Sequence, residues 1–128
     1  AMSLDITPSI PIGRQIVQSY GDHRFTISNE VFEMPVLVFP DETIPWSVTS
    51  IDDLSIASLS RVIEADPPVE IFLIGCGKGM ALIPPVLRDE LKAAGIVIEP
   101  MDTGAACRTF NVLTTEDRRV AAALIPVE

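Results

Sequence analysis

V-E-I-F-L-I-G-C-G-K-G, residues 69–79, is a short apolar run that ends in alternating glycines. Residues 71–74 are apolar at every position, so a strand here must be covered on both faces, as inside a parallel sheet. Gly75, Gly77 and Gly79 let the backbone turn sharply at the carboxyl end of this strand, the edge where open α/β sheets bind ligands. The stretch predicts an interior strand of an α/β sheet with a candidate site at its end.

Length and composition predict one soluble globular domain over residues 1–128, with 48% hydrophobic residues. The longest apolar run, residues 120–125, is far shorter than the ~20 residues that span a bilayer. Residues 1–13 lack the features of a secretory signal, and we expect them to form an extended arm with Ala1 as an expression remnant. These features predict a cytoplasmic protein without a membrane span.

Charge and metal-ligand content exclude two classes of function. The net charge of −9 would repel nucleic acid and anionic lipid, and the only adjacent basic pair is Arg118-Arg119. Cys76 and Cys107 lie far apart, and His23 is the only histidine, so ordinary zinc-ligand spacing is absent from the sequence. We therefore expect no nucleic-acid partner, no metal and no cofactor.

The first half of the chain is rich in predicted strands. Residues 16–20 and 24–27 flank a turn at residues 21–22 and predict an N-terminal β-hairpin. Residues 36–39 form an apolar run between prolines, and residues 46–48 predict a further short strand.

The middle of the chain predicts a strand–helix–strand unit. A first helix begins at Ser55, or alternatively at Ser50, and stops before the prolines at 67–68. The strand over residues 71–74 follows, and a second helix runs from residue 84 to a Gly95 cap. Residues 96–98 are the next strand, and a right-handed crossover makes it parallel to the strand before the helix.

The end of the chain predicts a third helix and a last strand. Thr103 is the expected cap of a helix whose apolar face holds Ala106, Phe110 and Leu113. Alanine content favours helix for residues 120–125, but a run without a polar face suits a strand buried on both sides. We predict a strand.

The glycine turn is a candidate phosphate cradle with Lys78 as the counter-charge. It matches neither the Walker loop nor the dinucleotide fingerprint, and the prolines at 84–85 remove amide donors from the next helix. The alternative is a tight turn on which a neighbouring segment packs. Cys76 beside Lys78 could be an activated thiol, yet no base accompanies it, and a buried inert cysteine is the other interpretation.

Polar residues along the third helix form the second half of the candidate site. If residues 102–103 end the strand after residue 98, this flank lies near the glycine turn. A small pocket would then be built from both stretches, whereas the alternative is that Asn111 satisfies buried backbone groups and Thr103 only caps its helix. The candidate ligand- or partner-binding residues are Gly75, Gly77, Lys78, Asp102, Thr103, Cys107, Arg108 and Asn111.

Residues 95–126, G-I-V-I-E-P-M-D-T-G-A-A-C-R-T-F-N-V-L-T-T-E-D-R-R-V-A-A-A-L-I-P, resemble the family of mitochondrial NADH:ubiquinone oxidoreductase (complex I) assembly factor 3. They also resemble the wider uncharacterised domain family typified by a methanogen protein. The matching positions are Asp102, Thr103, Ala106, Cys107, Thr109, Phe110, Asn111, Leu113, Arg119, Val120 and the A-A-L-I-P ending. Residues 67–77 are similar to the central strand and glycine turn of that family.

The resemblance implies a three-layer α/β fold with a mixed, mostly parallel five-stranded sheet, whose last strand is central and antiparallel to the others. It also implies that no enzymatic activity is established, and that mitochondrial members bind another assembly factor and early complex I subunits. No complete catalytic constellation appears in the chain. We expect a non-catalytic interaction protein, an assembly factor or chaperone for respiratory complex I, with a protein partner and with homo-oligomerisation left open. The alternative is a small-molecule or nucleotide-binding protein, conceivably an enzyme, that uses the pocket described above.

Overall fold

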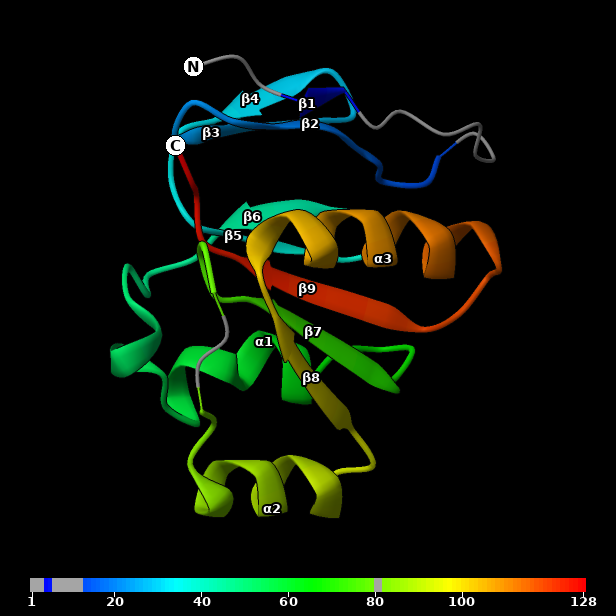
Figure 1. Ribbon diagram of the computed structural model, residues 1–128. Helices are drawn as coiled ribbons and strands as arrows, with labels where there is room; N and C mark the ends of the chain where they lie inside the picture. The colour runs from blue at the N-terminus through cyan, green and yellow to red at the C-terminus, as the bar shows by residue number, and fades with distance from the viewer. Residues whose placement is uncertain (1–3, 6–12, 80–81) are drawn as a thin grey trace.

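The computed structural model describes residues 4–5, 13–79 and 82–128, which form two sheets and their covering helices (Figure 1). The smaller sheet is antiparallel, in the order β1-β2-β3-β4. Its strands are β1 (Leu4–Asp5), β2 (Val17–Gly21), β3 (Arg24–Ile27) and β4 (Glu30–Phe32). The predicted N-terminal hairpin is thus present, with two more strands beside it.

The larger sheet has five strands in the order β6-β5-β9-β7-β8. They are β5 (Val36–Val38), β6 (Thr43–Pro45), β7 (Ile71–Gly75), β8 (Val97–Met101) and β9 (Val120–Leu124). β7 pairs in parallel with both β8 and β9, whereas β5 pairs antiparallel with β9 and with β6. The mixed, mostly parallel sheet and the central last strand are confirmed.

The expected direction of the last strand was wrong, because β9 is parallel to β7 and β5 is the strand that runs the opposite way. Helix α3 (Thr103–Thr115) explains the difference. It starts directly after β8 and carries the chain back to the end of the sheet at which β7 and β8 begin. β9 therefore runs in the same direction as β8.

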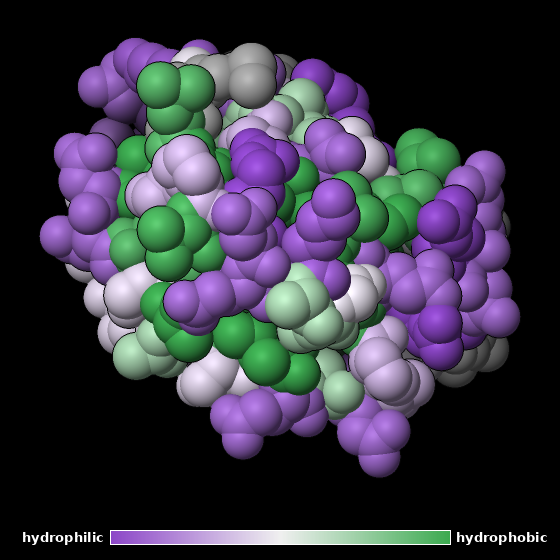
Figure 2. All heavy atoms as spheres, turned by 90° about the horizontal axis from the view of Figure 1, so that it is seen from below, coloured by the Kyte–Doolittle hydropathy of each residue, from purple (hydrophilic) through white to green (hydrophobic). Residues whose placement is uncertain are grey.

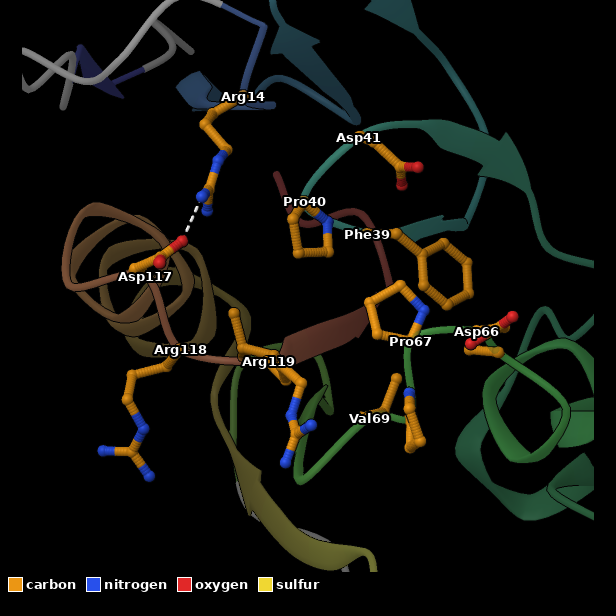
Figure 3. Close-up of a pocket in the computed structure, with 13 residues that line it drawn as sticks. Arg14, Phe39, Pro40, Asp41, Asp66, Pro67, Val69, Asp117, Arg118 and Arg119 are labelled. Atoms are coloured by element: carbon orange, nitrogen blue, oxygen red, sulfur yellow. Dashed lines mark hydrogen bonds and ion pairs between the residues drawn. The ribbon is translucent and has the colours of Figure 1, made fainter.

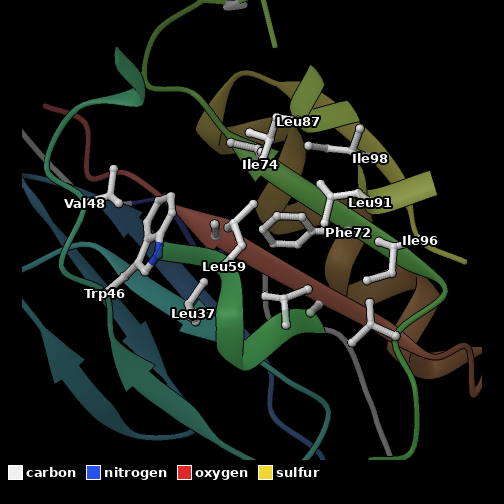
Figure 4. Packing of buried hydrophobic residues seen from close by; sticks show 14 of the residues in the cluster. Leu37, Trp46, Val48, Leu59, Phe72, Ile74, Leu87, Leu91, Ile96 and Ile98 are labelled. Atoms are coloured by element: carbon white, nitrogen blue, oxygen red, sulfur yellow. The ribbon is translucent and has the colours of Figure 1, made fainter. Parts of the chain in front are cut away.

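Three layers enclose two apolar cores, one on each face of the larger sheet. One face is covered by the short helix α1 (Ser60–Ile63), by α2 (Pro85–Ala93) and by the 3₁₀ turns η1 (Ile51–Asp53) and η2 (Ala57–Leu59). Phe72, Leu59 and Leu91 lie at the centre of this core (Figure 4). Helix α3 and the smaller sheet cover the other face, where Phe110 and Phe25 are buried. Every residue of β9 is buried, as its uniform apolar run predicted.

The predicted hairpin turn is shifted by one residue. Gly21 pairs with Arg24, so Asp22 and His23 are the turn residues, with φ of 55° and 59°. Two successive residues with positive φ are typical of the type I′ turn, whose twist suits a hairpin.

The short strand predicted over residues 46–48 lies earlier in the chain, because β6 ends at Pro45. Trp46 follows it and is buried, and its Nε1 donates a hydrogen bond to Ser58 O at 2.8 Å.

The first predicted helix is broken into η1, η2 and α1. The alternative start is used, because Ser50 is the N-cap of η1 and its Oγ accepts from Asp52 N–H. The expected start at Ser55 was wrong, since Ile56 is the N-cap of η2 and Ser55 Oγ accepts from Ser58 N–H one turn on. The Ser58 hydroxyl also donates to Ser55 O at 2.6 Å. Such local serine bonds compete with helical backbone bonds, which explains why a continuous helix does not form.

The later elements follow the prediction closely. Helix α2 begins at Pro85, and Gly95 has φ of 81°, the left-handed conformation of a helix C-terminus. β7 and β8 are parallel, as the crossover rule requires. Most of the predicted arm over residues 1–13, including Ala1, lies outside the described residues. Within it, Leu4 and Asp5 are described and pair with β2.

Thr114 offers a test of the core. It is 1% exposed, and its Oγ1 has no hydrogen-bond partner among the described residues. Because a buried hydroxyl without a partner is unfavourable, Thr114→Val is expected to raise the free energy of unfolding by about 1 kcal/mol in urea titrations. Thr115→Val is the control: Thr115 Oγ1 donates to Asn111 O at 2.8 Å, and we expect no gain. Equal effects of both substitutions would contradict the assignment.

Candidate functional site

The glycine turn is joined directly to the start of α3. Gly77 has φ of 90° and donates its N–H to Thr103 Oγ1 at 2.9 Å, while Thr103 N–H donates to Gly77 O at 2.8 Å. The Thr103 hydroxyl donates to Ile125 O at 2.7 Å. Thr103 thus connects the turn after β7, the start of α3 and the chain after β9.

Gly75 is needed for this close approach. A Cβ at Gly75 would lie 3.0 Å from the Thr103 Cα, tighter than ordinary van der Waals contact. The contact explains the glycine without a ligand, in agreement with the tight-turn alternative.

Asp102, and not Thr103, is the N-cap of α3. Its Oδ1 accepts from Ala105 N–H at 2.9 Å, whereas Thr103 is the first helical residue and is fully buried. The expected cap was therefore wrong by one position. An aspartate caps at least as well as a threonine, and the Thr103 hydroxyl is occupied by the contacts described above.

Asn111 lies two turns further along α3 and faces the smaller sheet. It is 3% exposed, and its side chain forms two hydrogen bonds of 2.9 Å with Val17, accepting from the N–H and donating to the carbonyl. The amide therefore satisfies the buried backbone of β2. This geometry supports the structural alternative for Asn111.

Arg108 and Tyr20 form another contact between α3 and β2. The Arg108 guanidinium donates to the Tyr20 hydroxyl at 2.7 Å. The tyrosine lies against Gly104, where a Cβ would be 2.6 Å from that hydroxyl. Tyr20 and Gly104 were missed by the sequence analysis, because nothing in the local pattern of a hairpin strand indicates which helix it covers.

Lys78 lies at the surface and pairs with Glu128, with 3.0 Å between Nζ and Oε2. The hydrogen bond and charge of Lys78 lower the pKa of Glu128 below its usual range. The lysine side chain is 72% exposed. The structure brings Gly75, Gly77 and Thr103 together at one sheet edge, whereas Lys78 and Asn111 do not converge on a common ligand position.

Both cysteines are free. Cys76 is half-buried, with its Sγ 3.5 Å from Ile74 O. Cys107 is fully buried, and this desolvation raises the pKa of its thiol to about 12. A thiol with so high a pKa is a poor nucleophile at neutral pH.

The Cys107 thiol is expected to make stability depend on pH. Because its pKa is higher in the folded than in the unfolded chain, the folded state keeps a proton that the unfolded state loses above about pH 9. The free energy of unfolding should therefore be unaffected by this group below pH 9 and fall by about 1.4 kcal/mol per pH unit above it, up to pH 12. Urea titrations of the wild type and of Cys107→Ala measure the difference, and parallel pH profiles would contradict the assignment.

A cavity of about 280 Å³ lies at the opposite edge of the larger sheet, where β7 and β9 begin. Phe39, Pro67 and Val69 contribute apolar surface to it (Figure 3). Arg14 lies at its rim and pairs with Asp117. The sequence analysis missed this site, although one signal was available: residues 66–68 and 117–119 precede neighbouring parallel strands, so they must meet.

Beside that cavity, Glu70 pairs with Arg119, and Glu70 Oε2 lies 4.0 Å from Arg118 Nη2.

No group of three or more histidine, cysteine or acidic side chains in the described part of the chain could hold a metal ion. Across the same residues, no helix has the length and apolar character needed to cross a membrane.

Comparison with known proteins identifies the family. Residues 17–125 match the family described as "Protein of unknown function (DUF498/DUF598)". The chain belongs to this family. A zebrafish (Danio rerio) relative named NADH dehydrogenase [ubiquinone] 1 alpha subcomplex assembly factor 3 is 37% identical over 111 residues, which cover 87% of this chain and 64% of the relative. The predicted resemblance to complex I assembly factors is confirmed, and the chain spans less than two thirds of that relative's length.

Bacterial members are similar over more of their length. An uncharacterised protein from Rhodobacter capsulatus is 39% identical over 111 residues, covering 87% of this chain and 84% of the relative. A crystal structure described as an outer membrane protein from Bartonella henselae is 35% identical, with a TM-score of 0.82. The match covers 91% of this chain and 98% of that chain. The fold described above is thus shared by bacterial relatives.

Proposed function

We propose that this protein is a non-catalytic binding factor that takes part in the assembly of respiratory complex I. The observation that carries the proposal is the similarity to assembly factor 3, which extends over 87% of the chain. The contacts of the candidate site support it, because Thr103 and Asn111 use their polar groups to hold the fold together.

The alternative of a small-molecule or nucleotide site between the glycine turn and α3 has little support in these contacts. It requires the amide of Asn111 and the ammonium of Lys78 to face one pocket. Asn111 is 3% exposed and bonded to Val17, and Lys78 pairs with Glu128 at the surface. We therefore favour the binding factor.

An apolar surface at the start of α2 is the proposed contact with the assembly partner. Leu82 is 98% exposed and Val86 69% exposed, with exposed prolines at 84 and 85 between them. Figure 2, which views the molecule from the α2 side, shows apolar residues gathered among polar ones on this face. Exposed apolar patches with polar rims often mark protein–protein contacts.

Backbone pairing at the β8 edge is an unfavourable way to bind that partner. Val97 N–H and Met101 O form hydrogen bonds with residues of the β7 segment, so the backbone polar groups of the alternate residues Ile98 and Pro100 point away from β7. Pro100 has no N–H to donate, and the Arg88 guanidinium already donates to Ile98 O at 3.4 Å. Pro45 occupies the equivalent outward position in β6, so side chains and not an added strand should hold the partner.

Affinity purification from the native host followed by mass spectrometry tests the proposal. The wild type is expected to recover complex I subunits, and Leu82→Ser/Val86→Ser to recover far less. Val97→Ser/Val112→Ser is the matched control, since these valines are 57% and 56% exposed away from the α2 start. Recovery of no complex I subunit by the wild type would overturn the proposal, and equal recovery by all three would move the contact elsewhere.

We propose a cytoplasmic location, as the sequence analysis predicts. One bacterial relative is described as an outer membrane protein, so the location has to be measured separately from the fold. Fractionation of the native host, with the protein followed by antibody, should recover it with cytoplasmic markers. Recovery in the outer-membrane fraction would contradict this part of the proposal.

A further inference from the structure

We propose that the amino-terminal edge of the larger sheet is a groove that binds an extended segment of a protein partner, in which an apolar residue lies between an acidic and a basic residue. This inference rests on the proposed function and adds a second contact besides the start of α2, together with the chemistry of the segment that it recognises. It depends on three observations: the joined cavities, their apolar centre and the separation of charge along them.

Two cavities, each of about 280 Å³, meet at this edge. They share four lining residues, Phe39, Asp41, Ala65 and Asp66, so they form one continuous depression. Phe39 is 7% exposed and lies at the junction. Pro40, Pro67 and Val69 add apolar surface on one side of it (Figure 3). The centre of the groove therefore suits an apolar side chain.

One end of the groove is basic. Arg14, Arg118 and Arg119 line it, and the neighbouring carboxylates are Asp117 and Glu70. Three guanidinium groups thus face two carboxylates, in a chain that has only nine basic residues and a net charge of −9. An acidic residue of the partner would complete the pairing at this end.

The other end is acidic. Glu42 and Glu64 line this cavity alone, and the shared Asp41 and Asp66 lie where it meets the first cavity. Arg61 also lines it and pairs with Glu42 at 2.9 Å. Four carboxylates face one guanidinium, so a lysine or arginine of the partner is favoured here. In Figure 3, Asp41 and Asp66 lie on the side of Phe39 and Pro67 that is away from Arg118 and Arg119. The charges are therefore separated along the groove.

An extended peptide fits this arrangement better than a compact ligand. Successive side chains of an extended chain are about 3.3 Å apart along the strand, so residues a few positions apart can reach the two charged ends while one between them enters the apolar centre. The groove lies away from the blocked β8 edge, and recognition by side chains needs no backbone pairing.

Titration of the ¹⁵N-labelled full chain with short capped peptides, followed by NMR, tests the inference. The probes carry aspartate at one end, leucine in the middle and lysine at the other end, in both orders. Like-charged probes carry two aspartates or two lysines, and a further probe has serine in place of leucine. The dipolar probes should shift the amide signals of the non-proline residues 39, 41, 42, 65, 66, 69 and 117–120. They should bind about 1.4- to 5-fold more tightly per ion pair than the like-charged probes.

Charge-reversed variants make the test specific. Arg118→Glu/Arg119→Glu should prefer the probe with two lysines. At the other end, Asp41→Lys/Glu64→Lys leaves two carboxylates against three cations and should prefer the probe with two aspartates. Arg24→Glu is the matched control, because Arg24 is an exposed arginine paired with Asp22 in the distant hairpin. Equal affinity for all charged probes, tight binding of the serine probe, or shifts outside the groove would overturn the inference.

The same variants separate this inference from the proposed function. If they recover complex I subunits from the host as well as the wild type does, the groove is not the recognition site, while the assembly role stands. If the wild type recovers none but the dipolar probes bind selectively in the groove, the assembly role fails and the peptide site stands.

Discussion

Asn111→Leu is expected to lower the free energy of unfolding by about 2–6 kcal/mol, since each buried backbone group left without a partner costs about 1–3 kcal/mol. The leucine side chain cannot replace the two 2.9 Å hydrogen bonds to the N–H and carbonyl of Val17, which is fully buried. Urea titration followed by circular dichroism measures the change. Such a loss is a large part of the 5–15 kcal/mol typical of a domain.

Val112→Ala on the same helix is the control for Asn111→Leu. Val112 is 56% exposed, so its truncation should change stability by less than about 0.5 kcal/mol. If Asn111→Leu were as mild as the control, the amide would be free for a ligand and the structural interpretation would be wrong. A large loss with Asn111→Leu alone would identify Asn111 as the link between α3 and β2.

The buried strands could be predicted from the sequence because their side chains allow few alternatives. β7 and β9 are apolar at nearly every position, and a strand without a polar face has to lie inside the sheet. The direction of β9 needed more than a local pattern, since it depends on how far α3 carries the chain before β9 begins. The broken first helix was missed because Ser55 and Ser58 bond to each other's backbone, which periodicity does not detect.

The candidate site could be predicted only in part. The crossover rule correctly placed Thr103 beside Gly77, because both follow neighbouring parallel strands. The same rule, applied to the opposite edge, would have brought Asp66 and Arg119 together before β7 and β9. The roles of Asn111 and Arg108 depended on Val17 and Tyr20 of the smaller sheet, whose position over α3 no local pattern specifies.

Thr103→Val is expected to lower the free energy of unfolding by about 2–4 kcal/mol. Two backbone groups that lose their partner would cost about 2–6 kcal/mol if fully buried, and we expect the lower part of that range because Gly77 and Ile125 are only partly buried. Valine keeps the shape of threonine but removes the hydroxyl that accepts from Gly77 N–H and donates to Ile125 O. Urea titration again gives the magnitude.

Thr103→Ser separates the hydroxyl from the methyl group. Serine keeps both hydrogen bonds and loses one methyl, so its effect should be close to the ~1 kcal/mol of a small buried truncation. If valine were tolerated better than serine, packing and not hydrogen bonding would hold the turn, and the Thr103 hydroxyl would be available to a ligand. If serine is tolerated and valine is not, the carboxyl edge of the sheet is closed by its own contacts. Binding would then have to use other surfaces, such as the start of α2 and the groove at the amino edge.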